Sequence, residues 1–227
     1  MGDSELQGRV DDVFGRIADA ARSADRDPEQ LTTIVVTKFH PDTLVRALFE
    51  FGIRDVGENR HQEAQAKAAA TADLEGLRWH FVGQLQSKKA RQVRAYAHAV
   101  HSLDRESVVD ALGADDGTLV DGFVQINLTD DPARGGVQAD ALEPLVERVL
   151  ATPGISLRGV MAVAPLDEEP RPAFARLRGL SDRVRSLAPG ADQISAGMSH
   201  DFAEAIAEGA THLRIGTAIT GNRPESR

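Results

Sequence analysis

The sequence contains no cysteine among its 227 residues, which excludes disulfides, thiolate metal ligands and a cysteine nucleophile. Aromatic residues are also scarce, because tryptophan and tyrosine occur once each, as Trp79 and Tyr96. A reaction that needs a tyrosine as acid or base therefore has a single candidate for that role. The seven histidines show neither an HxH nor an HExxH spacing, and we expect no metal site for this reason.

Long apolar runs and a surplus of basic residues are missing too. No stretch approaches the roughly 18 consecutive apolar residues of a membrane-spanning helix. The first residues are polar and acidic, where a signal peptide requires a basic start and an apolar run. The net charge is −9, with the acidic residues scattered along the chain. These features argue against nucleic acid and membrane partners, and we expect a cytoplasmic protein.

What the sequence does contain is a regular alternation of two patterns. Apolar residues at steps of three and four predict an amphipathic helix over residues 6–24. After Pro28, short apolar runs alternate with helical patterns. The runs predict eight strands at residues 32–38, 53–57, 78–83, 99–103, 119–128, 156–164, 193–196 and 212–216. The helical patterns cover residues 41–51, 59–72, 87–96, 105–112, 139–150, 172–187 and 199–208.

This alternation indicates the fold class. Strands that alternate with helices form parallel sheets with right-handed crossovers. Eight successive units favour a closed (β/α)8 barrel, a TIM barrel, over an open doubly wound sheet. No linker rich in Pro, Gly or Ser divides the chain, so residues 1–227 are predicted to form one α/β domain. The additional N-terminal helix is expected on the outside of the barrel or across its bottom.

Functional residues of such barrels gather at the carboxyl ends of the strands. The segment SAGMSHDF, residues 195–202, places Ser199 at the start of the helix after the seventh strand, where free backbone N–H groups bind anions. The segment RIGTAITG, residues 214–221, places Gly216 and Thr217 after the eighth strand. Each feature alone is typical of an ordinary cap or turn. Together, at adjacent strand ends, they predict a phosphate site.

The segment TIVVTKFHP, residues 33–41, ends the first predicted strand with Lys38. Such a lysine can extend into solvent or pair with a carboxylate such as Glu58. Across from a phosphate site it has another use. Burial between barrel walls and nearby cations leaves a fraction of it as the free amine, which adds to an aldehyde to give a Schiff base. The predicted ligand is then a phosphorylated aldehyde, either pyridoxal phosphate or a sugar phosphate of the kind that Schiff-base aldolases use.

Six segments, in order over nearly the whole chain, carry a resemblance to a known family: VVTKFHP, VGENRHQEA, WHFVGQLQSKKA, VHSLDR, RGVMAVAP and SAGMSHDFAEAIAEGATHLRIGTAITG. Together they are similar to the pyridoxal phosphate homeostasis proteins of the YggS/PROSC family. The resemblance implies an alanine-racemase-like barrel without that enzyme's second domain. It makes Lys38 the lysine that forms the internal aldimine, and it places Asn59 beside the cofactor ring and Arg214 at the pyridine nitrogen. The phosphate contacts that it implies are Ser199, Gly216 and Thr217.

The function implied by the resemblance is vitamin B6 homeostasis, with the chain as a monomeric carrier or buffer that supplies apo enzymes and is not itself an enzyme. Arginine at the ring nitrogen keeps its proton and leaves the pyridine unprotonated, which weakens the ring as an electron sink. A racemase also needs a second acid or base, and Tyr96 is predicted on the outer layer. A fold-type-III amino-acid racemase is the first alternative. A sugar-phosphate aldolase, which needs a Tyr or Glu beside the lysine, is the second.

Three other features need interpretation. Trp79 and His80 point to opposite faces of the third strand. We expect Trp79 in the core and leave His80 as either an interior residue or a neighbour of the cofactor ring. The basic cluster of residues 88–94 is interpreted as a solvated helix face. The alternative is a docking patch for anions or for an acidic partner. The chain departs from the usual family pattern at Thr37, Phe39, Gln84 and Ala196.

Overall fold

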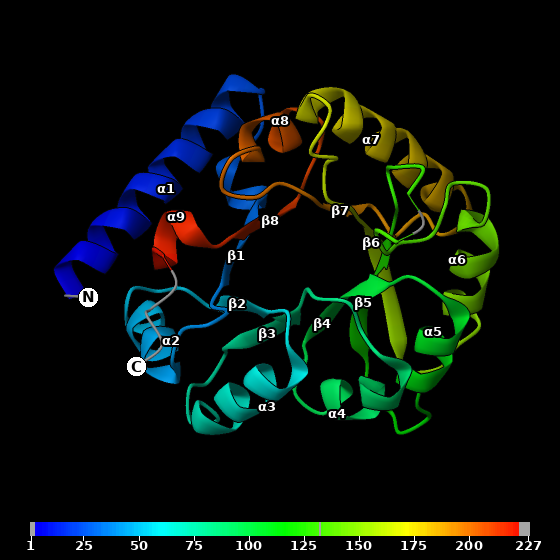
Figure 1. The fold of residues 1–227 in the computed structure, drawn as a ribbon, viewed down its shortest axis with the longest axis horizontal. Helices are drawn as coiled ribbons and strands as arrows, with labels where there is room; N and C mark the ends of the chain where they lie inside the picture. Colours follow the sequence, from blue (N-terminus) through cyan, green and yellow to red (C-terminus); the bar gives the residue numbers. More distant parts are fainter. Residues whose placement is uncertain (1–2, 132, 223–227) are drawn as a thin grey trace.

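The protein forms a closed barrel of eight parallel strands that follow one another in chain order (Figure 1). The structure is a computed structural model, described for residues 3–131 and 133–222. Strand β1 pairs with β2 on one side and with β8 on the other, which closes the barrel. The prediction of a (β/α)8 barrel is confirmed. The strands are β1 (Thr32–Val36), β2 (Asp55–Glu58), β3 (Arg78–Phe81), β4 (Ala99–Leu103), β5 (Val120–Gln125), β6 (Ile155–Met161), β7 (Gln193–Ser195) and β8 (His212–Ile215).

Helices surround the barrel on its outside (Figure 1). The additional N-terminal helix lies on the outside of the barrel, between α8 and α2 in the ring of helices, and packs against α8 and α9, which is one of its two expected positions (Figure 1). Arg26, just after this helix, donates to Ala210 O at 2.6 Å and to Ile206 O at 2.9 Å. The helices are α1 (Asp3–Ser23), α2 (Asp42–Glu50), α3 (His61–Ala70), α4 (Ala90–Arg94), α5 (Glu106–Leu112), α6 (Leu142–Leu150), α7 (Pro170–Leu187), α8 (Phe202–Ala207) and α9 (Thr217–Thr220).

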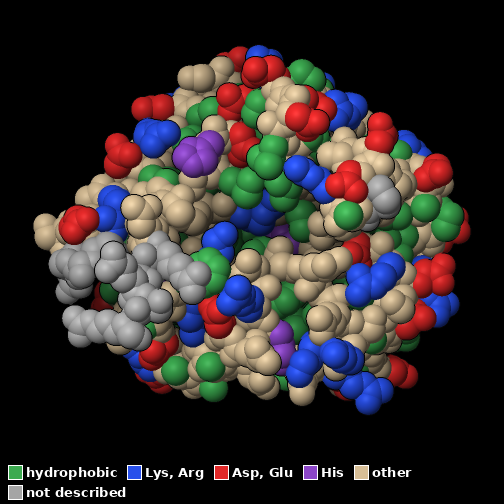
Figure 2. All heavy atoms as spheres, in the orientation of Figure 1, with side chains coloured by type: hydrophobic (Ala, Val, Ile, Leu, Met, Phe, Trp, Pro, Cys, Tyr) green, Lys and Arg blue, Asp and Glu red, His purple; other side chains and the backbone are tan. Residues whose placement is uncertain are grey.

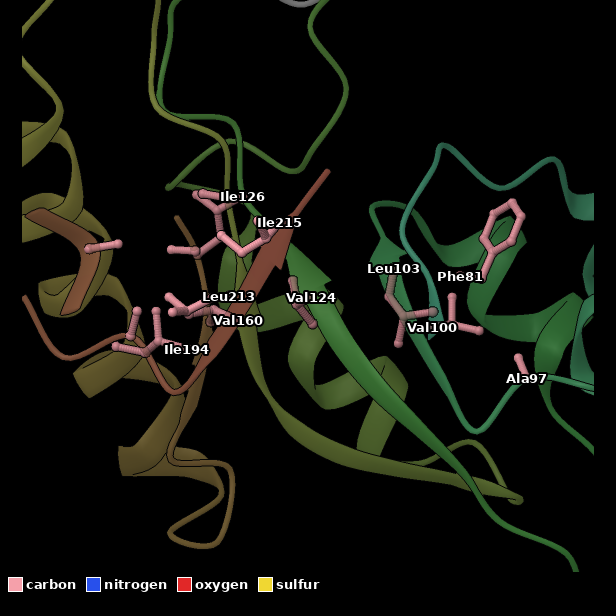
Figure 3. Close-up of a cluster of buried hydrophobic side chains, with 14 of the residues drawn as sticks. Phe81, Ala97, Val100, Leu103, Val124, Ile126, Val160, Ile194, Leu213 and Ile215 are labelled. Carbon is pink, nitrogen blue, oxygen red and sulfur yellow. The ribbon is translucent and has the colours of Figure 1, made fainter. Parts of the chain in front are cut away.

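The main hydrophobic core lies between the strands and the ring of helices. Val100, Val124 and Leu213 come from three different strands and are fully buried in this layer (Figure 3). Successive residues of a strand point to opposite faces, so Ala99 and Phe123 face the inside of the barrel. There they form a separate apolar cluster with Met161. Burial of the outer layer supplies most of the stabilisation of the fold, while the inside is available for polar groups.

Several predicted boundaries differ from the observed ones. Strand β1 ends at Val36, so Lys38 lies two residues beyond the strand and not at its end. The helix predicted for residues 87–96 divides into a 3-10 turn, Ser87–Lys89, and α4. A second 3-10 turn, Pro28–Gln30, and the short helix α9 were not predicted. In the part of the chain that the structure describes, no helix is both long and apolar enough to cross a membrane.

Candidate functional site

A cavity of about 280 Å³ lies at the carboxyl ends of the strands. Its volume is near the lower end of the usual range for small-molecule pockets. Figure 2 shows a hollow near the middle of the face it presents, with basic and hydrophobic side chains around it. All the predicted site residues line the cavity: Lys38, Asn59, Ser199, Arg214, Gly216 and Thr217. The other lining residues are Val36, Val82, Val163, Met198 and His200.

Lys38 lies in a tight turn that directly follows β1. His40 N–H donates to Thr37 O at 3.1 Å, which closes the turn around Lys38 and Phe39. Phe39 has φ +69°, a left-handed conformation that is unfavourable for a residue with a side chain but normal for the third position of a type II turn. Glu63 of α3 accepts the Phe39 N–H at 3.2 Å. The turn therefore fixes the backbone of Lys38 at the mouth of the barrel.

The structure does not pair Lys38 with Glu58. Glu58 is fully buried, and its Oε1 accepts hydrogen bonds from Lys67 Nζ and, at 2.9 Å, from Thr37 Oγ1. Burial raises the pKa of Glu58, although the hydrogen bond from Lys67 opposes this shift. Lys67 Nζ also donates to Thr37 O at 2.9 Å. Within the described residues Lys38 Nζ has neither a hydrogen bond nor an ion pair, so its amine is available to a ligand in the cavity.

Asn59 is held close to the neighbouring strand end by a glycine. A Cβ atom at Gly83 would lie 2.1 Å from the backbone oxygen of Asn59, so a residue with a side chain does not fit there. The Oδ1 atom of Asn59 is buried and has no hydrogen-bond partner in the described part of the chain. An unsatisfied buried acceptor costs about 1–3 kcal/mol. A ligand with a suitable donor would remove this cost.

Arg214 on β8 is only 6% exposed. Its Nη1 donates to Ser195 Oγ at 2.7 Å and to Ser195 O at 2.8 Å, and its Nη2 donates to Ala162 O at 2.9 Å. These three bonds to described residues leave two of the five N–H groups of a guanidinium for the cavity. Burial lowers the pKa of Arg214 to about 10, against the opposite effect of the Asp201 charge. The arginine is therefore protonated at neutral pH.

Ser199 does not begin a helix, so this prediction is wrong. Helix α8 begins at Phe202, and Ser199 lies in the turn before it. Asp201 Oδ1 accepts the N–H of Met198 at 2.6 Å, and this bond holds the segment in a turn that delays the helix by three residues. Ser199 Oγ instead accepts the N–H of Ala218 at 3.4 Å.

This contact brings the loops after β7 and β8 together at the cavity. Helix α9 starts at Thr217, with Gly216 as its N-cap residue. The N–H groups of Ile219 and Thr220 donate to Gly216 O, and that of Ala218 to Ser199 Oγ, so within the described residues the N–H of Thr217 is the one left for a ligand at this helix start. The hydroxyl groups of Ser199 and Thr217 lie at the same cavity. One side of the cavity thus offers hydroxyl and backbone N–H donors, which suit an anion.

Sequence reasoning missed two polar residues near the site. Lys67 lies on the buried face of α3 together with Ala64 and, just past the helix, Thr71. Their spacing of three and four residues is the signal that could have indicated a buried lysine. His200 directly follows Ser199 and is exposed at the rim of the cavity. No spacing in the sequence singles out His200, because its position depends on the turn before α8.

The other aromatic candidates do not line the cavity. Trp79 is 5% exposed and packs in the outer core, which confirms its prediction. His80 lies inside the barrel and is absent from the cavity lining. Tyr96 stacks on His61 with their ring centroids 6.0 Å apart, and burial raises its pKa. The tyrosine is therefore placed on the outer layer, as expected, and not at the site.

The basic cluster of residues 88–94 is solvated only in part. Lys88 and Arg91 are exposed, in agreement with the prediction. Arg94 instead donates to Gly154 O and to Thr118 O, both at 2.8 Å. It joins the loops at the amino ends of β5 and β6, so its role is structural and the prediction is wrong for this residue.

Comparisons with known proteins agree with this geometry. A family model described as the N-terminal domain of alanine racemase matches residues 32–224. The pyridoxal phosphate homeostasis protein of Mycobacterium tuberculosis is 38% identical over 242 residues, with 97% of this chain and 94% of that protein covered. The protein of the same name from Escherichia coli is 33% identical, with 99% of each chain covered. A structure of PipY from Synechococcus elongatus with PLP bound superposes with a TM-score of 0.79 at 33% identity, covering 90% of this chain and 100% of PipY. The chain therefore belongs to the family of pyridoxal phosphate homeostasis proteins.

Proposed function

We propose that this chain binds pyridoxal phosphate through Lys38 and acts as a carrier or buffer of this reactive aldehyde in vitamin B6 homeostasis. One observation carries the proposal: a single cavity joins a lysine without a partner among the described residues, a buried arginine, and hydroxyl and N–H donors. The names of the relatives and the PLP-bound structure of PipY support it.

The lining suits the two reactive ends of pyridoxal phosphate. An amine without a partner is what the aldehyde requires, and Lys38 supplies it. The phosphate requires several hydrogen-bond donors around an anion. The donors that we propose for it are Ser199, Gly216 and Thr217.

The lining also suits the pyridine ring between these ends. Val36 and Val82 provide apolar surface for the faces of the ring. Arg214 has N–H groups to spare for the ring nitrogen, and its guanidinium keeps its charge at neutral pH. Asn59 Oδ1, buried without a partner, would accept a hydrogen bond from the bound ligand. We propose that the loss of this unsatisfied acceptor contributes to affinity.

Binding through an amine also explains how a carrier releases its cargo. Lys38 would hold the cofactor through its aldehyde group, because a neutral amine and an aldehyde condense to an imine with loss of water. A second amine would take the place of Lys38 in this imine and leave the Lys38 amine free, so the cofactor would pass on without being consumed. We propose that the recipients are apo enzymes that take up the cofactor through the amine of a lysine of their own. We propose that the carrier is a monomer.

A carrier is favoured over an amino-acid racemase by the scarcity of acid and base groups. Bound pyridoxal phosphate acts as an electron sink, but an arginine at the ring nitrogen weakens this property. Racemisation further requires a proton donor and acceptor opposite Lys38. Tyr96 packs on the outer layer. Apart from Lys38 and Arg214, His200 is the one titratable side chain among the described lining residues, and it is exposed at the rim.

A sugar-phosphate aldolase is disfavoured by the carboxylates near Lys38. Such an enzyme needs a Tyr or Glu that moves protons beside the lysine. Glu58 is bonded to Lys67 and Thr37, and Glu63 accepts the N–H of Phe39. Neither glutamate lines the cavity. Both are engaged in shaping the turn around Lys38.

The proposal is tested by titration of the cofactor-free protein with pyridoxal phosphate, followed by an assay for turnover. We expect a visible absorbance band that saturates at one cofactor per chain, and no D-alanine above the level of free pyridoxal phosphate when L-alanine is added. Absence of a band would refute cofactor binding. Racemisation at enzyme-like rates, abolished in H200A, would instead establish the racemase alternative with His200 as its second base.

A further inference from the structure

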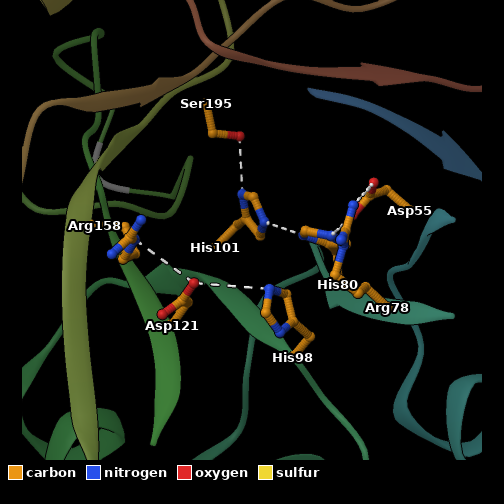
Figure 4. A network of polar contacts seen from close by, with 8 residues as sticks. All are labelled: Asp55, Arg78, His80, His98, His101, Asp121, Arg158 and Ser195. Carbon is orange, nitrogen blue, oxygen red and sulfur yellow. Dashed lines mark hydrogen bonds and ion pairs between the residues drawn. The ribbon is translucent and has the colours of Figure 1, made fainter. Parts of the chain in front are cut away.

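A chain of buried polar side chains runs through the inside of the barrel below the cavity (Figure 4). We call Asp55, His80, His101 and Ser195 the histidine chain. Ser195 Oγ lies 2.9 Å from His101 Nδ1, His101 Nε2 lies 3.0 Å from His80 Nδ1, and His80 Nε2 lies 2.9 Å from Asp55 Oδ1. All four residues are buried, and none is more than 8% exposed. The four residues come from β2, β3, β4 and β7, so the histidine chain crosses the inside of the barrel.

Both ends of the histidine chain are held by arginines. At the lower end Arg78 donates to Asp55 Oδ1 at 2.7 Å and to Oδ2 at 2.6 Å. Burial alone would raise the pKa of Asp55, but the hydrogen bonds from Arg78 and His80 outweigh it and hold the pKa well below its usual range. At the upper end Ser195 Oγ accepts from Arg214 at 2.7 Å. The histidine chain therefore links the Asp55 carboxylate, at the lower end of the barrel interior, to Arg214 in the cavity lining.

We infer the direction of these bonds from the upper end of the histidine chain. A guanidinium only donates, so Ser195 Oγ accepts from Arg214, and its own hydrogen is free to be donated to His101 Nδ1. Burial lowers the pKa of His101 well below its usual range, so the ring is neutral, and with Nδ1 as the acceptor from Ser195 its one proton is on Nε2. This proton is donated to His80 Nδ1, and His80 in turn donates from Nε2 to Asp55. Every donor then faces an acceptor.

We propose that His101 is a positioning residue of the cofactor site, because it receives the hydroxyl of Ser195 and so keeps Ser195 Oγ as an acceptor for Arg214. The inference rests on the proposed function, in which the free N–H groups of Arg214 face the ring nitrogen. Without an acceptor at His101, the serine hydroxyl turns toward other partners. Arg214 Nη1 then loses one of its two acceptors and keeps only Ser195 O, so the guanidinium is held less firmly and its two remaining N–H groups are less well oriented toward the ring nitrogen.

A packing role for His101 makes a different prediction. His101 stacks on Phe123, with ring centroids 4.3 Å apart and an angle of 10° between the rings. Phenylalanine at position 101 keeps an aromatic ring for this stack but offers no acceptor to Ser195. Asparagine loses the stack but retains an acceptor near the position of Nδ1. The pair His101→Phe and His101→Asn therefore separates hydrogen bonding from packing.

The direction of the hydrogen bonds in the histidine chain is tested first in the cofactor-free protein. With ¹⁵N-labelled histidine, two-bond proton–nitrogen correlations report which nitrogen carries the proton. We expect the Nε2–H tautomer at both His101 and His80 at pH 7.5. A proton on Nδ1 of His101 would reverse the bond to Ser195 and overturn the inference. This readout needs no bound cofactor.

The effect on the site is tested by titration with pyridoxal phosphate. We expect H101F to weaken binding about fivefold to tenfold, the effect of one lost or misaligned hydrogen bond, and to move the absorbance maximum of the bound cofactor. S195A is expected to act in the same direction, and H101N to restore much of the affinity. H98N is the matched control, because His98 lies beside His80 but makes no bond in the chain.

The two levels of proposal fail separately. If the wild-type protein binds no pyridoxal phosphate, the proposed function is wrong, and the tautomers of His101 and His80 still decide the direction of the chain. If the wild type and H101F bind it equally, with the same absorbance maximum, the positioning role is wrong and the proposed function stands. If H101N binds as weakly as H101F and S195A binds normally, His101 acts only through packing. Melting temperatures of all variants show that each one is folded.

Discussion

The two ends of the barrel interior handle buried polar groups in opposite ways. At the mouth, Asn59 Oδ1 is buried without a partner and Lys38 Nζ has none among the described residues. At the floor, both ring nitrogens of His80 and both oxygens of Asp55 are hydrogen-bonded. Buried polar groups in native proteins are nearly always satisfied. The unpartnered groups at the mouth are therefore open to a ligand, whereas the bonded pair His80 and Asp55 holds its shape without one.

The largest expected effect is at the mouth, in the variant K38A. Removal of the amine abolishes the covalent link to pyridoxal phosphate, and with it the visible absorbance band, while noncovalent contacts to the phosphate are kept. The stability of the cofactor-free protein is expected to stay close to that of the wild type, because Lys38 has no described partner. Absorbance titration and thermal unfolding measure the two effects.

The exposed Lys88 provides the control for this prediction. K88A is expected to bind pyridoxal phosphate with the affinity and the absorbance band of the wild type. A saturating band that survives in K38A, or one that disappears in K88A, would show that the link forms elsewhere.

The second prediction concerns the buried pair that holds the turn before Lys38. E58Q leaves the ammonium of Lys67 buried beside a neutral group, and we expect it to lower the free energy of unfolding by about 3–5 kcal/mol. K67M leaves the carboxylate of Glu58 uncompensated, with a similar loss. The double variant E58Q/K67M removes both charges, and we expect it to be more stable than either single variant. Urea unfolding of the wild type, the two single variants and the double variant gives the coupling energy between Glu58 and Lys67. If the stability losses of the two single variants simply add in the double variant, the two residues do not act as a pair.

The third prediction concerns the floor and its pH dependence. Burial lowers the pKa of His101 well below its usual range and that of His212 to about 3. Below about pH 6.5 the unfolded chain takes up protons at both residues and the folded protein does not. Stability is therefore lost as the pH falls, by about 1.4 kcal/mol per pH unit for each histidine that stays neutral.

Glu58 opposes this trend, because its raised pKa lets the folded state take up a proton before the unfolded chain does. Urea unfolding at pH 7.0 and pH 5.5 measures the net slope in the wild type. In H101F one of the two neutral histidines is gone, and we expect a shallower slope. An equal slope in the two proteins would show that His101 titrates alike in the folded and unfolded states.

The smallest expected effect tests the orphaned acceptor at the mouth. N59A removes the buried Oδ1 atom that has no partner, so we expect the stability of the cofactor-free protein to change by less than about 1 kcal/mol. Affinity for pyridoxal phosphate is expected to fall about fivefold, the value of one hydrogen bond. Q62A, at an exposed position of α3, is the control and should change neither quantity. A large loss of stability in N59A would mean that the side chain supports the fold instead of the ligand.

The barrel was predictable from the sequence because its signal is local. Each strand is a short apolar run such as TIVV at residues 33–36, and each is followed by a helical pattern. The candidate site followed from the barrel, since carboxyl ends of parallel strands meet at one face. Lys38, Ser199 and Gly216 could therefore be placed together before the structure was known, although they lie far apart in the sequence.

The parts that could not be predicted depend on contacts across the barrel or on turn geometry. The bond between His101 and Ser195 joins residues 94 positions apart, and no local sequence pattern around either residue predicts the contact. The turn before α8 depends on Asp201 reaching back to Met198, which moved the helix start away from Ser199. Phe39 adopts a positive φ that its residue type does not indicate.

The central claim is that Lys38, and no other lysine, forms the covalent link to pyridoxal phosphate. The chain has four lysines: Lys38, Lys67, Lys88 and Lys89. Borohydride reduction of the saturated protein makes the link permanent, and peptide mass mapping then identifies the modified residue. We predict one reduced pyridoxyl phosphate group per chain, on Lys38. A modification on Lys67, a spread over Lys88 and Lys89, or no modification of a protein that shows the visible band would contradict the account.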